Sequence, residues 1–207
     1  RERCSQVVGI VLVTNQSDGN VILRGDLDVL EGASSIRESI CGYEHDVGPF
    51  SFFQINPVSA GALFERALDA AGRGHTCLEL FSGVGVLTLP LSDRFERVVA
   101  VEAVEEAAKS LADRLSGLGK EGVEARWGDA ASVARDVLSE HEVEVLVADP
   151  PRRGLGDELC ALICESRVRR VVLLSCEPKT LARDLPRLGA GGFNVKAVWG
   201  IDQFPRT

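Results

Sequence analysis

One cysteine, Cys176, stands at a position from which a thiol could act as a nucleophile. The apolar, β-forming run from Val171 to Leu174 leads into Ser175-Cys176, and Pro178 then opens a predicted helix. This pattern predicts a buried strand that delivers the thiol to the rim of a sheet, where ligands of open α/β sheets bind. Most cysteines, however, are small apolar residues that only pack. Cys176 is therefore a candidate nucleophile that the rest of the chain must support or oppose.

A glycine-containing turn, Glu79-Leu80-Phe81-Ser82-Gly83-Val84-Gly85, links a second apolar run to a predicted helix. Glycines at such a turn let the backbone approach a ligand at the amino terminus of a helix. A dinucleotide-binding fingerprint would need a third glycine at position 88, which is Thr88, so NAD binding is disfavoured. An acid-x-x-x-Gly-x-Gly turn is instead typical of enzymes that use S-adenosylmethionine.

Two further acidic residues end the next two predicted strands. In a cofactor site of this kind, Glu102 would accept hydrogen bonds from both ribose hydroxyls, and Asp129 would face the adenine amino group. Each acid could instead be a helix N-cap, a role that suits Asp129 well. Acids at three successive strand ends favour the cofactor interpretation more than a Gly-x-Gly turn does alone.

The segment Asp149-Pro150-Pro151-Arg152 ends the fourth predicted strand of this region and forms a stiff loop, because proline fixes φ and lacks an N–H. Related loops with an aromatic fourth residue serve enzymes that methylate exocyclic nitrogens of bases. Here the fourth residue is Arg152, and a cysteine follows on the next strand. Carbon 5 of uracil has no lone pair, so a thiolate must first add to carbon 6 and generate an enolate that can take a methyl group. The combination therefore indicates methylation at carbon.

Composition limits the remaining choices. The chain has 207 residues, 45% of them hydrophobic, and contains no apolar run long enough to span a membrane, so a cytoplasmic globular protein is expected. Its six cysteines mostly lie in apolar segments, without the spacing of a metal site, and are expected to be reduced thiols. The net charge of −8 gives no overall attraction for nucleic acid, although arginines gather in the last third. The absence of methionine suggests a piece of a longer protein.

The elements that must position these residues alternate regularly after residue 76. A hairpin is predicted around the loop 15–20, between 7–13 and 21–23, and a helix runs from Asn56-Pro57 to Gly72. The predicted strands that follow cover 76–80, 97–101, 123–126, 142–148, 169–175 and 193–199. The predicted helices between them begin near 86 and cover 103–115, 130–139, 157–165 and 178–188. Strict alternation with near-continuous apolar strands predicts a doubly wound α/β sheet, mostly parallel.

These motifs together resemble the RNA 5-methyluridine methyltransferases, which modify uridines in transfer and ribosomal RNA. The resemblance runs from about residue 50 to the end, with the motifs in the family's order. The matching segments are Ser51-Phe52-Phe53-Gln54-Ile55-Asn56-Pro57, Leu80-Phe81-Ser82-Gly83-Val84-Gly85, Val101-Glu102, Gly128-Asp129-Ala130, Asp149-Pro150-Pro151-Arg152, Ser175-Cys176-Glu177-Pro178, Leu181-Ala182-Arg183-Asp184 and Phe204-Pro205.

The resemblance implies a Rossmann-like methyltransferase domain over 50–207, preceded by the remnant of a small β-rich domain over 1–49. It implies S-adenosyl-L-methionine as cofactor, no metal, a monomer, and tRNA or rRNA as partner, with the target uridine flipped into the pocket. Cys176 would be the nucleophile. The residues implied to bind the cofactor are Gln54, Phe81, Gly83, Glu102, Asp129 and Asp149.

Several positions depart from the family pattern. Ser82 replaces a cysteine, Val86 replaces an asparagine that bonds the cofactor, and Glu177 replaces an asparagine beside the nucleophile, where a carboxylate disfavours the thiolate unless it points away. The family's general base, a glutamate after Phe204-Pro205, and its final strand are not within these residues. The family's RNA-binding amino-terminal domain and iron–sulfur cysteines are not within them either. This exact chain is therefore expected to lack full turnover.

Two alternatives stay open at this stage. The chain could be a non-catalytic fragment that binds cofactor or RNA, which the missing base favours. It could also be a base-amino methyltransferase, which would not need Cys176.

Overall fold

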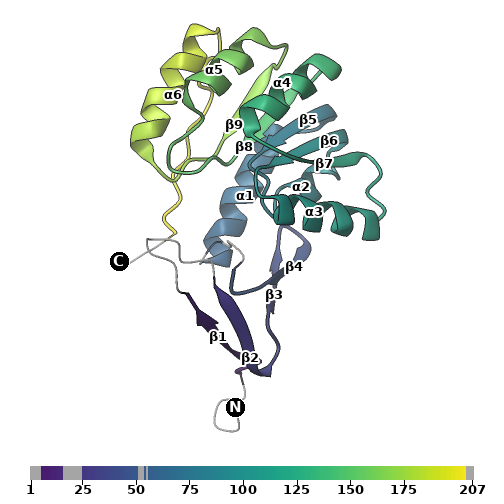
Figure 1. The fold of residues 1–207 in the computed structure, drawn as a ribbon. Coiled ribbons are helices and arrows are strands. Elements are labelled where there is room, and N and C mark those ends of the chain that lie inside the picture. Colours follow the sequence, from purple (N-terminus) through teal and green to yellow (C-terminus); the bar gives the residue numbers. More distant parts are fainter. Residues whose placement is uncertain (1–5, 16–24, 51–53, 55, 204–207) are drawn as a thin grey trace.

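The computed structural model describes residues 6–15, 25–50, 54 and 56–203. Two antiparallel hairpins come first in the chain and lie together at one end of the molecule (Figure 1). Strand β1 (Gly9–Thr14) pairs with β2 (Asp26–Gly32), and β3 (Ile36–Ile40) pairs with β4 (Tyr43–Val47). The first hairpin was expected from the sequence, but its second strand begins at Asp26, and the predicted segment 21–23 lies outside the described residues.

The main body is a parallel sheet of five strands in the order β7-β6-β5-β8-β9. Its strands are β5 (Gly74–Leu80), β6 (Phe95–Glu102), β7 (Val123–Trp127), β8 (Val145–Ala148) and β9 (Arg170–Leu173). From β5, the chain adds β6 and then β7 on one side. It then crosses back and adds β8 and β9 on the other side of β5. This reversal creates a crevice at the carboxyl end of β5, where ligands of doubly wound sheets bind.

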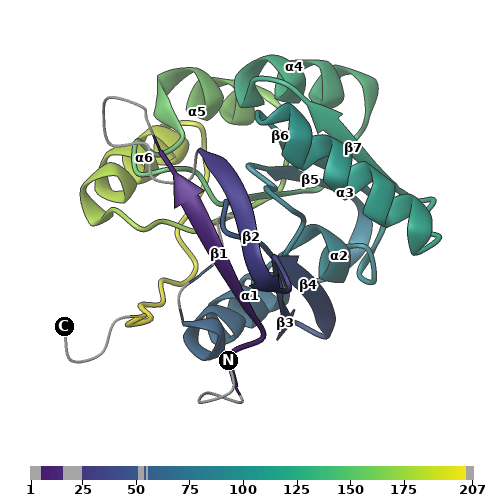
Figure 2. The same ribbon diagram turned by 60° about the horizontal axis from the view of Figure 1, so that its bottom comes forward.

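Six helices pack against this sheet. They are α1 (Pro57–Ala71), α2 (Thr88–Leu91), α3 (Glu105–Gly117), α4 (Ala130–Glu140), α5 (Gly156–Glu165) and α6 (Pro178–Ala190). Helices α4 and α5 lie on one side of the sheet, and α1 and α2 lie on the other (Figure 2). The expected doubly wound α/β architecture is confirmed.

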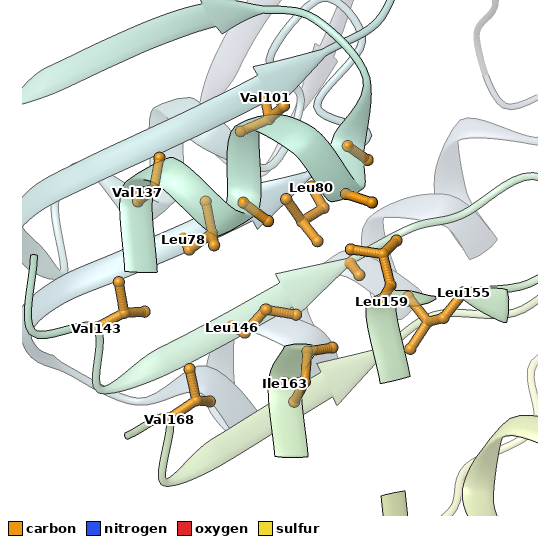
Figure 3. Close-up of a cluster of buried hydrophobic side chains, with 14 of the residues drawn as sticks. Leu78, Leu80, Val101, Val137, Val143, Leu146, Leu155, Leu159, Ile163 and Val168 are labelled. Atoms are coloured by element: carbon orange, nitrogen blue, oxygen red, sulfur yellow. The ribbon is translucent and has the colours of Figure 1, made fainter. Parts of the chain in front are cut away.

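Alternation along each strand supplies both faces of the sheet with a core. On β5, Leu78 and Leu80 point into the cluster beneath α4 and α5 (Figure 3), whereas the neighbouring Cys77 packs in the cluster against α1. All three side chains are fully buried, as are most residues of β6 and β8. Strands buried on both faces read as continuous apolar runs, which is why the sequence located them well.

Helix α1 begins and ends as its sequence predicts. The Asn56 side chain accepts a hydrogen bond from the Ser59 N–H at 3.2 Å, Pro57 takes the first helical position, and Gly72 ends the helix with φ 76°. Its apolar face packs on the sheet and on Ile40 of β3, so the second hairpin is attached to the main body through α1.

One predicted element is wrong within the described residues. Residues 193–199 form no strand, although their pattern predicts one. In the described part of the chain, β9 is the last strand of the sheet and pairs only with β8. A strand exists through its hydrogen-bonded neighbour, and this segment has none there. Val195, Val198 and Trp199 accordingly stay more than half exposed, at 59%, 68% and 51%.

The helix predicted from about residue 86 is also shorter than expected, because α2 is a single turn. No helix in the described part of the chain combines the length and the apolar character that crossing a membrane requires.

Candidate active site

The residues singled out from the sequence gather at one edge of the sheet. Because the five strands are parallel, their carboxyl ends share that edge. Phe81 follows β5, Glu102 ends β6, and Asp129, Asp149 and Cys176 follow β7, β8 and β9, respectively. The topology therefore brings together side chains that lie almost a hundred positions apart in the chain.

The glycine turn after β5 has the backbone conformation that its sequence demands. Phe81 has φ 64°, which is uncommon outside glycine, and Gly83 and Gly85 have φ 55° and 84°. A Cβ atom at Gly85 would collide with Leu111 of α3. The turn is thus packed tightly against α3 while its own backbone faces the crevice.

Glu102 holds this turn in place. Its Oε2 accepts a hydrogen bond from the Gly83 N–H at 2.8 Å, and its Oε1 accepts one from the Val104 N–H at 2.8 Å. Each carboxylate oxygen has a second lone-pair direction, so further hydrogen bonds from a ligand's hydroxyls remain available. Glu102 therefore has a structural role that the sequence did not reveal, in addition to any ligand contact.

Asp129 is the N-cap of α4, as the alternative interpretation of the sequence proposed. Its Oδ2 accepts hydrogen bonds from the Ala131 and Ser132 N–H groups, both at 3.1 Å. The same residue also lines a cavity in the crevice. The two interpretations are thus compatible in this structure.

Two cavities open along the edge, and Phe81 lines both. The larger has a volume of about 380 Å³ and the smaller about 80 Å³. The larger is lined by Phe81, Asp129–Ala131, Arg153–Leu159 and Arg183. The smaller is lined by Ile40, Gln54, Phe64, Glu79, Phe81–Val84, Val86, Leu87 and Asp149. A long ligand could therefore lie across the glycine turn with one end in each cavity.

Glu79, the acid that opens the glycine-turn motif, was not among the residues expected to bind the cofactor, but it lies at the site. Its side chain is only 3% exposed, it lines the smaller cavity, and its Oε2 has no hydrogen-bond partner among the described residues. Burial raises the pKa of Glu79 to about 8; the Thr88 hydroxyl opposes this shift, and the negative charges of Asp149 and Glu102 add to it. The signal in the sequence was its position as the acid of the glycine-turn motif at the end of β5.

Asp149, from the other side of the same cavity, also has a perturbed carboxyl group. Burial raises its pKa to about 6. Two carboxyl groups with raised pKa values beside one small cavity are typical of a functional site rather than of packing.

The buried carboxyl of Glu79 predicts an unusual dependence of stability on pH. A raised pKa means that the folded chain binds more protons than the unfolded chain between pH 4.5 and 8, so the free energy of unfolding falls as pH rises through that range. Glu79→Gln removes this loss, at most about 1.4 kcal/mol per pH unit. Urea unfolding at pH 5.5, 6.5 and 7.5 measures both slopes. The exposed Glu121→Gln is the matched control, and equal slopes for Glu79→Gln and the parent chain would contradict the assignment.

Cys176 is exposed and lies just past the end of β9, anchored by the buried Leu174. It does not line either cavity, so only its place at the same edge relates it to them. Of the six cysteines, the five in the described residues are free thiols, and Cys176 alone among them is exposed. The thiol is thus accessible from solvent at the rim, as the strand pattern predicted.

Glu177, beside the thiol, has its charge compensated. Its Oε2 accepts a hydrogen bond from Arg152 at 3.1 Å, and its Oε1 accepts one from the Lys179 N–H at 3.3 Å as the N-cap of α6. The hydrogen bond from Arg152 holds the pKa of Glu177 below its usual range. The carboxylate of Glu177 is directed to Arg152 and the amino terminus of α6. The repulsion between this carboxylate and a Cys176 thiolate, expected from the sequence, is thereby reduced.

Helix α6 ties the double-proline loop to the cysteine. Three of its side chains reach the loop: Thr180 donates to the Arg152 carbonyl at 3.1 Å, Arg183 donates to the Arg153 carbonyl at 2.6 Å, and Asp184 accepts from the Leu155 N–H at 2.8 Å. The Leu-Ala-Arg-Asp motif therefore positions one loop relative to the other.

The arginines that cluster in the last third of the sequence separate in space. Arg152, Arg153 and Lys179 are exposed near Cys176 at the carboxyl edge. Arg169 and Arg170 lie at the opposite end, where β9 begins, and Arg170 donates to the Ala71 carbonyl. The first group, together with Arg183 of the larger cavity, can approach a ligand bound at the edge.

Gln54 lines the smaller cavity, as the resemblance implied. The neighbouring segments 51–53 and 55, and the motif at 204–205, lie outside the described residues.

Comparison with known proteins shows that the chain is similar to RNA methyltransferases. Residues 131–207 match the family model described as tRNA (uracil-5-)-methyltransferase. An uncharacterized RNA methyltransferase of Oceanobacillus iheyensis is 33% identical over 100% of this chain and 46% of its own length. Another, of Gloeobacter violaceus, is 33% identical over 100% of this chain and 45% of its own length. The chain thus spans about half the length of the curated relatives it matches.

Solved structures of methyltransferases are also similar to this chain. The crystal structure of a Pyrococcus abyssi tRNA (uracil-54, C5)-methyltransferase in complex with S-adenosyl-L-homocysteine is 28% identical, with a TM-score of 0.69, over 85% of this chain and 42% of that one. An S-adenosylmethionine-dependent methyltransferase of Agrobacterium tumefaciens, 18% identical, covers 79% of this chain and 61% of its own, with a TM-score of 0.59, which supports the fold alone.

Proposed function

Because this chain is a relative of the tRNA (uracil-5-)-methyltransferases, we propose that it is the catalytic part of an enzyme that methylates carbon 5 of a uridine in RNA. The methyl donor is S-adenosyl-L-methionine. The observation that carries the proposal is the exposed thiol of Cys176 at the same sheet edge as the two cavities and the double-proline loop. Residues 50–207 form the methyltransferase domain in this proposal, and residues 1–49 belong to a small β-rich domain.

The residues at the sheet edge suit the adenosine, ribose and amino-acid portions of S-adenosyl-L-methionine. The larger cavity, beside Asp129, suits the adenosine portion, and the smaller one, beside Glu79 and Asp149, suits a cationic amino-acid end. Glu102 accepts a hydrogen bond from Gly83, which lines the smaller cavity, and in this proposal the ribose hydroxyls reach its carboxylate. The unpartnered Oε2 of Glu79 favours a ligand with a donor group at that end. When bound, the cofactor supplies an electrophilic methyl group.

The chain's own chemistry rests on Cys176. Its thiolate adds to carbon 6 of the uracil ring, and the electron pair of the 5,6 double bond moves to carbon 5 as an enolate. Carbon 5 then takes the methyl group. A base then takes the proton from carbon 5, which restores the double bond and expels the thiolate; the resemblance places that base after Phe204-Pro205, beyond these residues. The ion pair between Arg152 and Glu177 keeps a carboxylate charge away from the thiolate during the addition.

The exposed Arg152, Arg153 and Lys179 offer a local basic surface in a chain whose net charge is −8. Basic side chains contact the phosphate backbone of nucleic acids without reading sequence. In this proposal they hold RNA at the edge while the uridine is flipped towards Cys176. Transfer RNA and ribosomal RNA are the two candidate substrates.

Label transfer tests the proposal directly. The chain is incubated with S-adenosyl-L-methionine carrying a labelled methyl group and with unmodified tRNA or rRNA transcripts, and the nucleosides are separated. Label in 5-methyluridine supports the proposal, and the labelled transcript identifies the substrate. Label in an amino-methylated base would support the base-amino alternative. Cofactor binding without any adduct to 5-fluorouridine RNA, even when the chain is extended past Thr207 to include the family's general base, would support the non-catalytic alternative.

Glu102→Ala is expected to weaken cofactor binding by about 1–3 kcal/mol, since ligand hydroxyls lose their acceptor. The Gly83 N–H loses its partner as well, which adds to the effect. Titration calorimetry with S-adenosyl-L-homocysteine measures the change. The exposed Glu105→Ala, three residues along the chain, serves as the control and should leave the affinity unchanged. Unchanged affinity in Glu102→Ala would remove Glu102 from the site.

A further inference from the structure

Glu79 is placed where a carboxylate is costly. It is the last residue but one of β5, on the face of the sheet that packs in the cluster against α1, and it is 3% exposed. The side chains around the smaller cavity include the apolar Ile40, Phe64 and Leu87. An ionised carboxyl group in such surroundings needs a charged or hydrogen-bonding partner.

Within the described residues, the groups that face Glu79 supply no positive charge. Asp149 approaches from the end of β8 and Glu102 from the end of β6, and both are acidic. On its own strand, Cys77 is buried nearby, and the short helix α2 contributes the buried hydroxyl of Thr88. The Oε2 atom is left without a partner among the described residues and belongs to the cavity lining.

We propose that Glu79 carries a proton in the free protein and gives it up when the ammonium group of the cofactor's amino-acid end enters the smaller cavity. This inference rests on the proposed function and adds a coupling to it. The exchange balances: a neutral carboxylic acid and an ammonium ion become a carboxylate–ammonium pair, and one proton leaves for solvent. The sheet edge thus contains a cation receptor that stays neutral until its ligand arrives.

The pKa values support this geometry. The pKa of Glu79 is raised to about 8 and that of Asp149 to about 6, chiefly by burial. Burial thus favours the neutral form of Glu79 more strongly than that of Asp149, and Glu79 is the group that the coupling assigns as the source of the proton at pH 7. Below pH 8, affinity for the cofactor rises with pH, by as much as tenfold per unit while a full proton is released.

Titration calorimetry in two buffers tests the coupling. S-adenosyl-L-homocysteine, which keeps the amino-acid end, is titrated into the chain at pH 7 in phosphate and in Tris. Their different ionisation enthalpies convert proton release into a difference between the observed heats. The expected release is close to one proton for the parent chain and close to none at pH 7 for Glu79→Gln, whose affinity should depend on pH much less steeply and only through Asp149. Glu121→Gln, an exposed carboxyl on the turn before β7, should behave as the parent.

A second ligand keeps the test independent of any variant. Methylthioadenosine has the adenosine portion and the sulfur but lacks the amino-acid end, so it should bind the parent chain without releasing a proton. Release with methylthioadenosine, no release with S-adenosyl-L-homocysteine, or undiminished release in Glu79→Gln would each overturn the coupling while leaving the methyltransferase proposal intact. Failure of the parent chain to bind S-adenosyl-L-homocysteine at all would contradict the proposed function and the coupling together.

Discussion

Cys176→Ala is expected to abolish methyl transfer to uridine, lowering the rate by more than about a thousandfold. The reason is electronic: without addition of a thiolate to carbon 6, carbon 5 of uracil has no electron pair with which to take the methyl group. The thiol is exposed, and alanine preserves the backbone of the loop after β9, so the fold should be unaffected. Cofactor affinity should also be unchanged, because Cys176 lines neither cavity.

The most direct readout is a covalent adduct. RNA that carries 5-fluorouridine cannot lose a proton from carbon 5 after methyl transfer, so the bond to the enzyme persists and mass spectrometry detects it. The parent chain should form the adduct in the presence of cofactor, and Cys176→Ala should not. Cys164→Ala is the matched control, because Cys164 is half-buried beside α6 and bonds only the Arg187 and Leu188 carbonyls. Methylated product from Cys176→Ala would instead favour a base-amino methyltransferase.

Asp184→Ala is expected to lower the free energy of unfolding by about 3 kcal/mol. This is close to the loss measured when one partner of a buried ion pair is removed. Asp184 is fully buried and accepts hydrogen bonds from Arg183 at 2.8 Å and Arg187 at 3.1 Å, besides the Leu155 N–H at 2.8 Å. Alanine leaves a buried N–H without an acceptor and two arginines without their shared anion. Both arginines reach solvent, which limits the loss.

The same change should also weaken cofactor binding, since the Leu155 N–H fixes the loop that follows Asp149. Chemical unfolding measures stability, and calorimetry with S-adenosyl-L-homocysteine measures affinity. Asp157→Ala is the control: Asp157 also pairs with Arg187, but its side chain is 82% exposed, so its loss should stay within about 0.5 kcal/mol. Asp184→Asn should be intermediate, because its amide oxygen can still accept from Leu155. Equal stability of Asp184→Ala and Asp157→Ala would show that the buried cluster does not hold the loop.

Much of the architecture was readable from local patterns. Five of the six predicted strands formed near their predicted positions, since strands buried on both faces are runs of apolar residues with polar ends. The helices that follow them also formed, except that α2 is a single turn. The exception, residues 193–199, has the apolar pattern of a strand but no neighbouring strand among the described residues. Pairing is a property of the sheet and not of the segment, so the pattern alone could not reveal the difference.

The sequence by itself determined which chemical groups end the strands: the thiol of Cys176, the carboxylates of Glu102, Asp129 and Asp149, and the glycine turn. Strand endings are visible because hydrophobicity changes abruptly there. Only the tertiary structure decided what surrounds each group. It showed that the carboxyl of Glu79 is shut into a cavity, that Arg152 takes the charge of Glu177, and that α6 holds the double-proline loop. These effects depend on burial and on contacts between distant segments, and neither is encoded in the spacing of neighbouring residues.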